Sequence, residues 1–265
     1  MAFGSFEMVR TKLLKWATRY VDRHRGENDS NPETNGEFAL LARLCPGLKR
    51  VIDGGANRGD WAAWLLERNQ ALDIVCVEPH PDLTNALEQR LGERRARVVR
   101  AALGAAVGRA ELHVFDDAFS EGHSLHRRDS IETSFGVSAQ TRSVHVPVFD
   151  LNRLLAEVGW DRACYLKLDV EGHEPEALKG AAAALAEGRV DAGQFEYGGT
   201  YIDSRALLKD AFEILIGTRC SVFLVLPKGL RAVPTYDSRL ENYQFKTFAF
   251  FRPDSPLLHR CRIIS

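Results

Sequence analysis

The sequence predicts an α/β fold with a doubly wound, mostly parallel sheet. From residue 48 onward, short β-branched or apolar runs alternate with segments of helical periodicity, as in βαβ units. The first run ends in a glycine-rich turn, VIDGGANRG at 51–59, which leads into a helical segment. Because βαβ crossovers are right-handed, repeated units close naturally as a doubly wound sheet.

The elements follow from this alternation in chain order. We expect strands at 49–53, 73–78, 96–101, 163–169, 190–196, 220–226 and 244–251. We expect helices at 58–69, 81–91, 150–158, 175–187 and 204–216. The last strand follows its predecessor through a loop without a helix, so we expect it to run antiparallel in a seven-strand sheet.

Two regions do not follow the alternation of strands and helices. Residues 1–37 read as an amphipathic helix and a polar linker, and 38–265 as one domain with a rim insertion at about 104–149, where extra strands flank a polar loop. Up to residue 25 the chain holds six Lys and Arg against two acids, with apolar residues at three- and four-residue steps. This stripe favours packing against the domain; binding to a membrane surface or a partner chain is the alternative.

Composition narrows the function. The chain has 265 residues and a net charge of −1, which provides no overall field for nucleic acid. Its five cysteines lack a C-x-x-C pair, which argues against a disulfide framework and a zinc site. No apolar run reaches the roughly 20 residues of a membrane span. Charged residues near the N-terminus are atypical of a signal peptide, so we expect a cytoplasmic protein, with homo-oligomers left open.

The glycine-rich turn fails the P-loop pattern and is a weak match to the dinucleotide-binding fingerprint. Asp60 and Trp61 stand where a P-loop needs Lys and Ser or Thr, and Ala56 replaces the second glycine of a dinucleotide fingerprint. Two acids, Asp53 and Asp60, bracket the turn. Such a bracket suits a cationic ligand.

S-adenosylmethionine has the matching chemistry, because it carries a sulfonium, an ammonium and a ribose but no phosphate. Glu78 lies at the end of the second strand, where a carboxylate can accept from both ribose hydroxyls, while Asp53 can accept from the ammonium. The expected cofactor-binding residues are Asp53, Gly54, Gly55, Ala56, Asn57, Gly59, Glu78 and Pro79, with Ala101 and Ala102 beside the adenine.

The fourth strand and the turn after it carry residues suited to catalysis. An alcohol needs a general base or a metal before it can accept a methyl group. Asp169 is the first choice as base or cofactor contact, with His173 as an alternative base and Glu171 in the same turn. Glu196 ends the next strand, and a divalent ion between it and Asp169 is a less favoured arrangement. Lys167, in an apolar strand, must pair with a carboxylate.

Several segments together resemble the FkbM-type methyltransferases. They are DGGANRG at 53–59, VEP at 77–79, YLKLDVEGHE at 165–174 and QFEY at 194–197. The resemblance runs from about 48 to 251 and implies the class I methyltransferase, Rossmann-like fold. It also implies an S-adenosylmethionine-dependent O-methyltransferase acting on a hydroxyl of a sugar, glycan or polyketide-type natural product. Ser124 and Leu125 look like the family's segment that approaches the cofactor.

The acceptor is expected to be a small molecule or glycan with a hydroxyl group. Candidate acceptor contacts are Lys167, Arg127, Tyr197 and Tyr236, although a solvated basic turn is the favoured interpretation of Arg127. A nicotinamide-dependent short-chain dehydrogenase or epimerase is one alternative. It is weakened because no tyrosine here has a lysine four positions later. A non-catalytic cofactor-binding protein is the other alternative.

Overall fold

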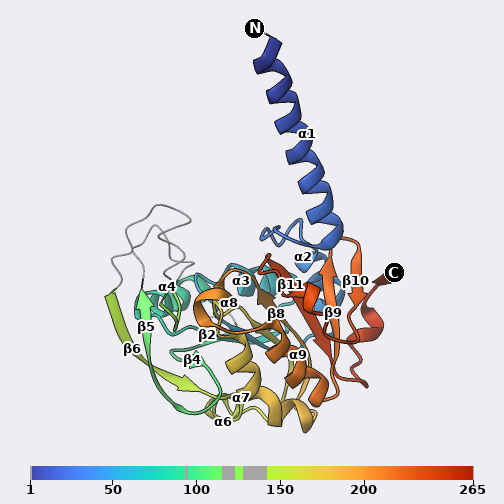
Figure 1. Cartoon of the computed structure of the whole chain (residues 1–265). Helices are drawn as coiled ribbons and strands as arrows, with labels where there is room; N and C mark the ends of the chain where they lie inside the picture. Colours follow the sequence, from blue (N-terminus) through green and yellow to red (C-terminus); the bar gives the residue numbers. More distant parts are fainter. Residues whose placement is uncertain (1, 93–94, 115–122, 128–141, 265) are drawn as a thin grey trace.

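A mostly parallel sheet runs through the centre of the protein in the computed structural model, which describes residues 2–92, 95–114, 123–127 and 142–264 (Figure 1). Within these residues the strand order is β12-β10-β9-β11-β8-β7-β1-β2-β3. The five neighbouring strands β8, β7, β1, β2 and β3 are parallel to one another. Strand β11 is antiparallel to both β8 and β9. The predicted doubly wound sheet with an antiparallel last strand is therefore confirmed.

The seven predicted strands are all present in this sheet. They are β1 (Arg50–Gly54), β2 (Asp73–Val77), β3 (Ala96–Val99), β7 (Ala163–Leu168), β8 (Val190–Tyr197), β9 (Ser221–Leu226) and β11 (Lys246–Phe251). Two short strands, β10 (Gly229–Ala232) and β12 (Ile263–Ile264), extend one edge and were not predicted. Strand β10 has one large apolar residue, Leu230, and β12 has only two residues, so neither forms an apolar run like those of the predicted strands.

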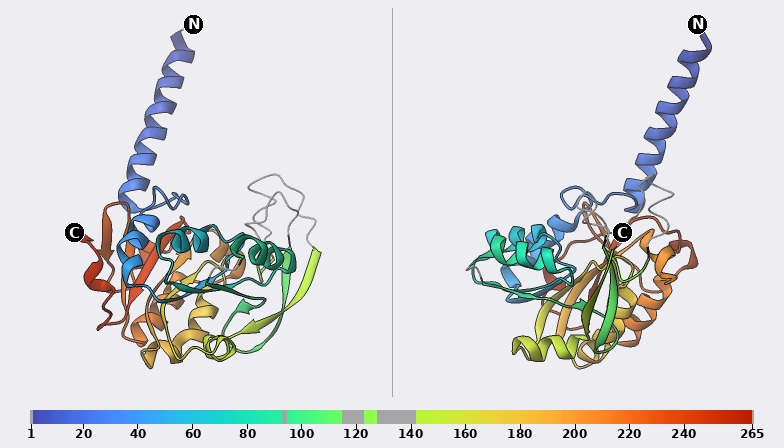
Figure 2. Two further views of the ribbon diagram at one scale, coloured as in Figure 1. Left: turned by 180° about the vertical axis from the view of Figure 1, so that it is seen from behind. Right: turned by 90° about the vertical axis from the view of Figure 1, so that its left-hand side faces the viewer.

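Helices cover both faces of the sheet (Figure 2). One core lies under α6 (Leu151–Val158), α7 (Glu174–Ala186) and α9 (Leu208–Gly217). The other lies under α2 (Glu37–Leu44), α3 (Asp60–Arg68) and α4 (Pro81–Leu91). Short 3₁₀ turns occupy Cys45–Gly47, Ser238–Leu240 and Leu258–Arg260.

The helix predicted at 204–216 is wrong at its start. A separate short helix, α8 (Thr200–Ser204), ends at Arg205, whose φ is 55°. The chain then turns, and Asp210 accepts a hydrogen bond from the backbone N–H of Leu207 at 3.0 Å, just before α9 begins. Helix α2 was not predicted at all.

The insertion forms a second, smaller sheet in the order β4-β6-β5. Its strands are β4 (Ala102–Leu103), β5 (Gly108–Val114) and β6 (Arg142–Phe149), the last two antiparallel as a hairpin would be. The two extra strands expected around the polar loop are thus confirmed. Of the loop at 116–141, only residues 123–127 lie within the described part.

The first helix, α1 (Ala2–Arg25), projects away from the rest of the protein (Figures 1 and 2). Its apolar side chains Leu13, Trp16 and Tyr20 are exposed, so the favoured prediction that the stripe packs on the domain is wrong for the described side chains. Among the described residues, no helix combines the length and apolar character that a bilayer crossing requires.

The segment after α1, predicted as a polar linker, lies against the domain. Glu27 and Asn35 are buried, and the N–H of Asn28 donates to the carbonyl of Phe245 at 3.0 Å. These contacts bring residues 26–36 beside the carboxyl end of the sheet.

Candidate functional site

The turn between β1 and α3 packs directly against the neighbouring strands. The N–H groups of Gly55 and Ala56 donate to the carbonyl of Val77, at 2.9 and 3.1 Å. Gly55 has a φ of +78°, and a Cβ there would lie 1.8 Å from the carbonyl oxygen of Asp169. Only glycine fits such a conformation at such a close approach.

Glu78 follows β2 and is held by backbone donors on both oxygens. Oε2 accepts from the N–H of Asn57 and Oε1 from the N–H of His80, each at 2.9 Å. Burial raises the pKa of Glu78 to about 7, although these two hydrogen bonds favour the charged form. The carboxylate is therefore fixed in orientation while facing the cavity described below.

Lys167 on β7 links two carboxylates. Its Nζ lies 3.0 Å from Oδ2 of Asp169 and 3.3 Å from Oδ1 of Asp53 on the adjacent strand β1. The predicted pairing of Lys167 is confirmed. Burial alone would lower the pKa of Lys167, but the carboxylates around it raise that pKa, so the side chain is a cation. Burial raises the pKa of Asp53, against the effect of Lys167.

Two further carboxylates face the same region. Glu196 is the penultimate residue of β8, which pairs with β7, and Glu37 begins α2. Burial, with the negative charges of Asp169 and Glu37, raises the pKa of Glu196. Burial also raises the pKa of Glu37, whose Oε1 accepts from Nε2 of Gln194 at 2.6 Å.

The turn after β7 is braced from within. Glu174, the first residue of α7, is buried and accepts from the N–H groups of Val170 and Gly172 at 2.8 and 3.0 Å. Burial raises its pKa to about 8. Ser124 Oγ donates to the carbonyl of Glu171 at 2.8 Å and so ties the insertion to this turn.

His173 pairs with a second histidine. Its Nδ1 lies 3.0 Å from Nε2 of His126, and burial together with that neighbour lowers the pKa of His173 to about 4. His173 is therefore a neutral imidazole near pH 7, and a weak base. Its candidacy as the alternative base is not favoured by this environment.

These elements surround a cavity of about 790 Å³, within the usual range for small-molecule sites. The predicted residues that line it are Ala56, Asn57, Gly55, Glu78, Pro79, Ala101, Ala102, Ser124, Leu125, Lys167, Asp169, Glu171, His173, Glu196 and Tyr197. Gly54, Gly59 and Asp53 lie behind this lining. Asp53 is fully buried and meets Lys167 rather than the cavity.

The other predicted residues lie outside the cavity lining or have their polar groups engaged by the protein. Arg127 and Tyr236 lie outside the lining. The hydroxyl of Tyr236 donates to Glu241 at 2.9 Å, and that of Tyr197 donates to Glu241 at 3.1 Å while accepting from the N–H of Tyr243. Both tyrosine hydroxyls are thus engaged by the protein, which argues against the role of acceptor contact. Asp60, one of the bracketing acids, pairs with Arg90 at 2.6 Å near the surface.

Sequence reasoning missed one wall of the cavity. Ser30 and Pro32 come from the segment after α1, Glu37 and Phe38 come from α2, and Phe245 lies immediately before β11. Glu37 directly follows two residues, Asn35 and Gly36, that resemble a polar connection. The signal that could have revealed α2 is the apolar spacing of Phe38, Leu41 and Leu44.

Acids outnumber bases around the cavity, which fits a cationic ligand and a ribose. The charged lining residues are Glu37, Asp60, Glu78, Asp169, Glu171, Glu174 and Glu196, against Arg58 and Lys167. Within the described residues, no group of three or more His, Cys, Asp or Glu side chains could hold a metal ion.

Comparison with known proteins gives one family match. The family model described as the methyltransferase FkbM domain matches residues 53–213, which is more than half of the chain. No curated protein sequence matches significantly.

The solved structures that match this chain are distant from it in sequence. An FkbM methyltransferase from Methylobacillus flagellatus KT is 18% identical, with a TM-score of 0.45; 77% of this chain aligns with 44% of that one. This chain thus spans less than half of that protein's length. A TehB-like SAM-dependent methyltransferase from Corynebacterium glutamicum is 14% identical, with a TM-score of 0.41. The match covers 92% of this chain and 99% of that one. A 1,6-didemethyltoxoflavin-N1-methyltransferase from Burkholderia thailandensis is 14% identical, with a TM-score of 0.41. The match covers 92% of this chain and 90% of that one. That structure contains 1,6-didemethyltoxoflavin and S-adenosylhomocysteine.

Proposed function

The chain belongs to the FkbM methyltransferase family, and we propose that it methylates a hydroxyl of a sugar, glycan or polyketide-type natural product with S-adenosylmethionine as donor. One observation carries the proposal: carboxyl groups outnumber cations in the lining of the cavity at the carboxyl ends of the parallel strands. Ligands of open α/β sheets bind at this edge. The family gives no support to the dehydrogenase alternative.

The cofactor's nucleoside fits the wall made by β1, β2 and β4. Glu78 would accept from the two ribose hydroxyls, since its own backbone partners already fix both oxygens in place. Ala101 and Ala102 offer small apolar side chains to the adenine, and Ser124 and Leu125 close that side. When bound, S-adenosylmethionine supplies an activated methyl group on its sulfonium.

The chain's own chemistry then consists of orienting the acceptor and removing its proton. Asp169 lines the cavity, and its Oδ2 is held 3.0 Å from the Lys167 ammonium. We assign Asp169 as the general base, oriented by Lys167. Asp53 acts indirectly, because its contact at 3.3 Å keeps Lys167 in place.

Glu196 and Glu37 are assigned to the acceptor. Both line the cavity on the side away from Glu78's strand, where their carboxyl groups can hydrogen-bond to the hydroxyls of an acceptor. Phe38 and Phe245 add apolar surface, which suits the faces of a sugar ring or a polyketide. These contacts favour a neutral or amine-bearing polyol over an anionic acceptor.

The test has a binding arm and a turnover arm. Calorimetry with S-adenosylmethionine and S-adenosylhomocysteine measures cofactor binding, and mass spectrometry detects a mass gain of one methyl group on a panel of sugars, amino sugars and polyketides. We expect Asp169→Asn to bind cofactor near wild-type affinity and to lose turnover by about 10²–10⁴-fold, the contribution of a general base. Asp161→Asn, at an exposed position after α6, serves as the matched control.

Two results would count against these assignments. Absence of cofactor binding by the wild type at millimolar concentration would reject the methyltransferase site as described. If Asp169→Asn kept full turnover and Glu196→Gln lost turnover, the role of general base would be assigned to Glu196.

A further inference from the structure

Helix α1 exposes an apolar face that the domain does not cover. Leu13, Leu14, Trp16, Tyr20 and Val21 are between 41% and 66% exposed. Large apolar side chains grouped in this way usually mark an interaction surface. Trp16 and Tyr20 stack on each other, with ring centroids 5.8 Å apart.

The opposite face of α1 is basic. At 3.6 residues per turn, Lys12, Lys15, Arg19 and Arg23 fall on one side of the helix, away from the stripe that contains Leu13 and Tyr20. Along α1, six Lys and Arg stand against Glu7 and Asp22. The rest of the chain carries 29 Lys and Arg against 34 Asp and Glu, so the positive charge is concentrated on this helix.

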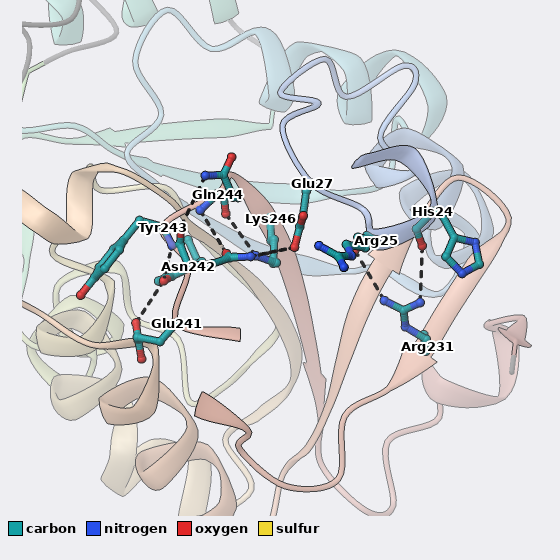
Figure 3. A network of polar contacts seen from close by, with 10 residues as sticks. His24, Arg25, Glu27, Arg231, Glu241, Asn242, Tyr243, Gln244 and Lys246 are labelled. Atoms are coloured by element: carbon teal, nitrogen blue, oxygen red, sulfur yellow. Dashed lines mark hydrogen bonds and ion pairs between the residues drawn. The ribbon is translucent and has the colours of Figure 1, made fainter. Parts of the chain in front are cut away.

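The base of α1 is fixed to the domain, as Figure 3 shows. The guanidinium of Arg231 on β10 donates to the carbonyl oxygens of His24 and Arg25, each at 3.5 Å. Just past the helix, Glu27 forms a buried ion pair with Lys246 at 3.3 Å. These contacts hold the end of α1 beside residues that line the cavity, since Ser30 and Pro32 follow closely in the chain.

We propose that α1 binds the surface of an anionic lipid bilayer, lying in the headgroup region with its apolar stripe toward the acyl chains. A basic polar face, an apolar face with aromatic residues and few acids are the features of interfacial helices. Trp and Tyr prefer the membrane interface because their rings are apolar and their edges polar. The domain is net negative, so an anionic surface attracts the helix and repels the domain, which orients the protein.

A second copy of the chain fits the same face less well. Two α1 helices paired through Leu13, Trp16 and Tyr20 would place Arg10, Lys12 and Arg19 along the flanks of the seam. Flanking positions in paired helices are normally of opposite charge, and here they are all positive. Like charges therefore oppose self-pairing, whereas anionic headgroups neutralise them.

The experiment is vesicle flotation of the whole chain with phosphatidylcholine vesicles and with vesicles that also contain phosphatidylglycerol. We expect binding to the anionic vesicles, weakened by high salt, and little binding to the neutral ones. Each basic residue near an anionic surface contributes roughly fivefold in affinity, about 1 kcal/mol. Lys12→Glu/Lys15→Glu/Arg19→Glu is therefore expected to weaken binding by about 100-fold or more.

Matched variants separate the helix from the overall charge. Lys49→Glu/Lys209→Glu/Arg219→Glu changes the net charge by the same amount at exposed domain positions, and we expect it to bind as the wild type does. Leu13→Gln/Trp16→Gln should abolish binding, whereas Val107→Gln/Ile216→Gln, which alters exposed apolar residues of the domain, should not. Circular dichroism checks that each variant is folded.

Two outcomes would overturn the proposal. One is equal binding to both kinds of vesicle or binding to neither. The other is a dimer in sedimentation velocity that Leu13→Gln/Trp16→Gln dissociates, without vesicle binding by the wild type. The latter would assign the stripe to a second copy of the chain.

Discussion

The substitution Glu78→Gln tests the cofactor site most directly. Glutamine keeps the size of the side chain but removes its charge. Because the two oxygens of Glu78 accept from the N–H groups of Asn57 and His80, the amide nitrogen of glutamine must face one of these donors. The substitution therefore weakens the acceptor and misorients it at once.

The expected loss follows from the hydrogen bonds to the ribose. A hydrogen bond to a charged group contributes about 1.5–3 kcal/mol, so two such bonds contribute about 3–6 kcal/mol. Part of this remains with a neutral acceptor. We expect the Kd for S-adenosylhomocysteine to rise by about 100-fold, which corresponds to about 2.8 kcal/mol. Titration calorimetry measures it, and Glu88→Gln on the exposed side of α4 is the control, with affinity expected to be unchanged.

The same side chain predicts a pH dependence. The ribose hydroxyls donate to the carboxylate, so binding favours ionised Glu78. With a pKa of about 7 before binding, wild-type affinity should fall about tenfold per pH unit below pH 7 and level off above it. Glu78→Gln should lack this dependence. A wild-type affinity that is flat from about pH 5.5 to about pH 8.5, or a Gln variant of normal affinity, would refute the reasoning.

Three further substitutions probe the site. Lys167→Met leaves Asp53 buried without its cation and should cost about 3–5 kcal/mol in urea unfolding, with partial recovery when Asp53→Asn is added; no loss would show that the pair is dispensable. Gly55→Ala places a Cβ against the carbonyl of Asp169 at a residue in the left-handed conformation. It should lower the free energy of unfolding by about 2–5 kcal/mol in the same urea assay. It should also weaken cofactor binding in calorimetry. Glu37→Gln should raise KM for the acceptor by about tenfold while the cofactor Kd stays constant; an equal effect on both would place Glu37 at the cofactor.

The periodicity of the sequence was sufficient for the sheet. Period-two and uninterrupted apolar runs are direct consequences of burial on one or both faces, so seven strands could be located without the structure. The pairing of Lys167 could also be predicted from the sequence, because a buried ammonium group needs a carboxylate partner. Helix α8 and strands β10 and β12 were not predicted, because α8 has only five residues, β10 (Gly229–Ala232) has one large apolar residue, and β12 has only two residues.

The site was predicted less completely, for a physical reason. Residues that follow a strand are brought to the sheet edge by the fold itself, and Glu78, Asp169 and Glu196 were found in this way. Glu37 reaches the cavity only because the preceding segment lies back over the domain. That return depends on contacts such as Glu27 with Lys246, which join residues more than two hundred positions apart. Local patterns do not encode such long-range contacts.

The tyrosines illustrate the complementary error. Tyr197 ends a strand at the correct edge, and position alone made it a candidate for the acceptor. In the structure its hydroxyl is fully engaged by Glu241 and by the backbone of Tyr243. A polar group at the correct edge is thus available to a ligand only when the protein leaves its hydrogen bonds unmade, a property of packing rather than of sequence position.

The charge balance of the cavity connects binding to chemistry. Lys167 is a buried cation that pairs with Asp53 and Asp169, while burial raises the pKa of Glu196 and of Glu37 against the attraction of Lys167. A positively charged ligand beside them favours their ionised forms. The carboxyl groups of the cavity are therefore ionised in a larger fraction of molecules when such a ligand is present, although each of them becomes a weaker base. A phosphate-bearing ligand would have the opposite effect, which is why the acids of this cavity favour a methyl donor over a dinucleotide.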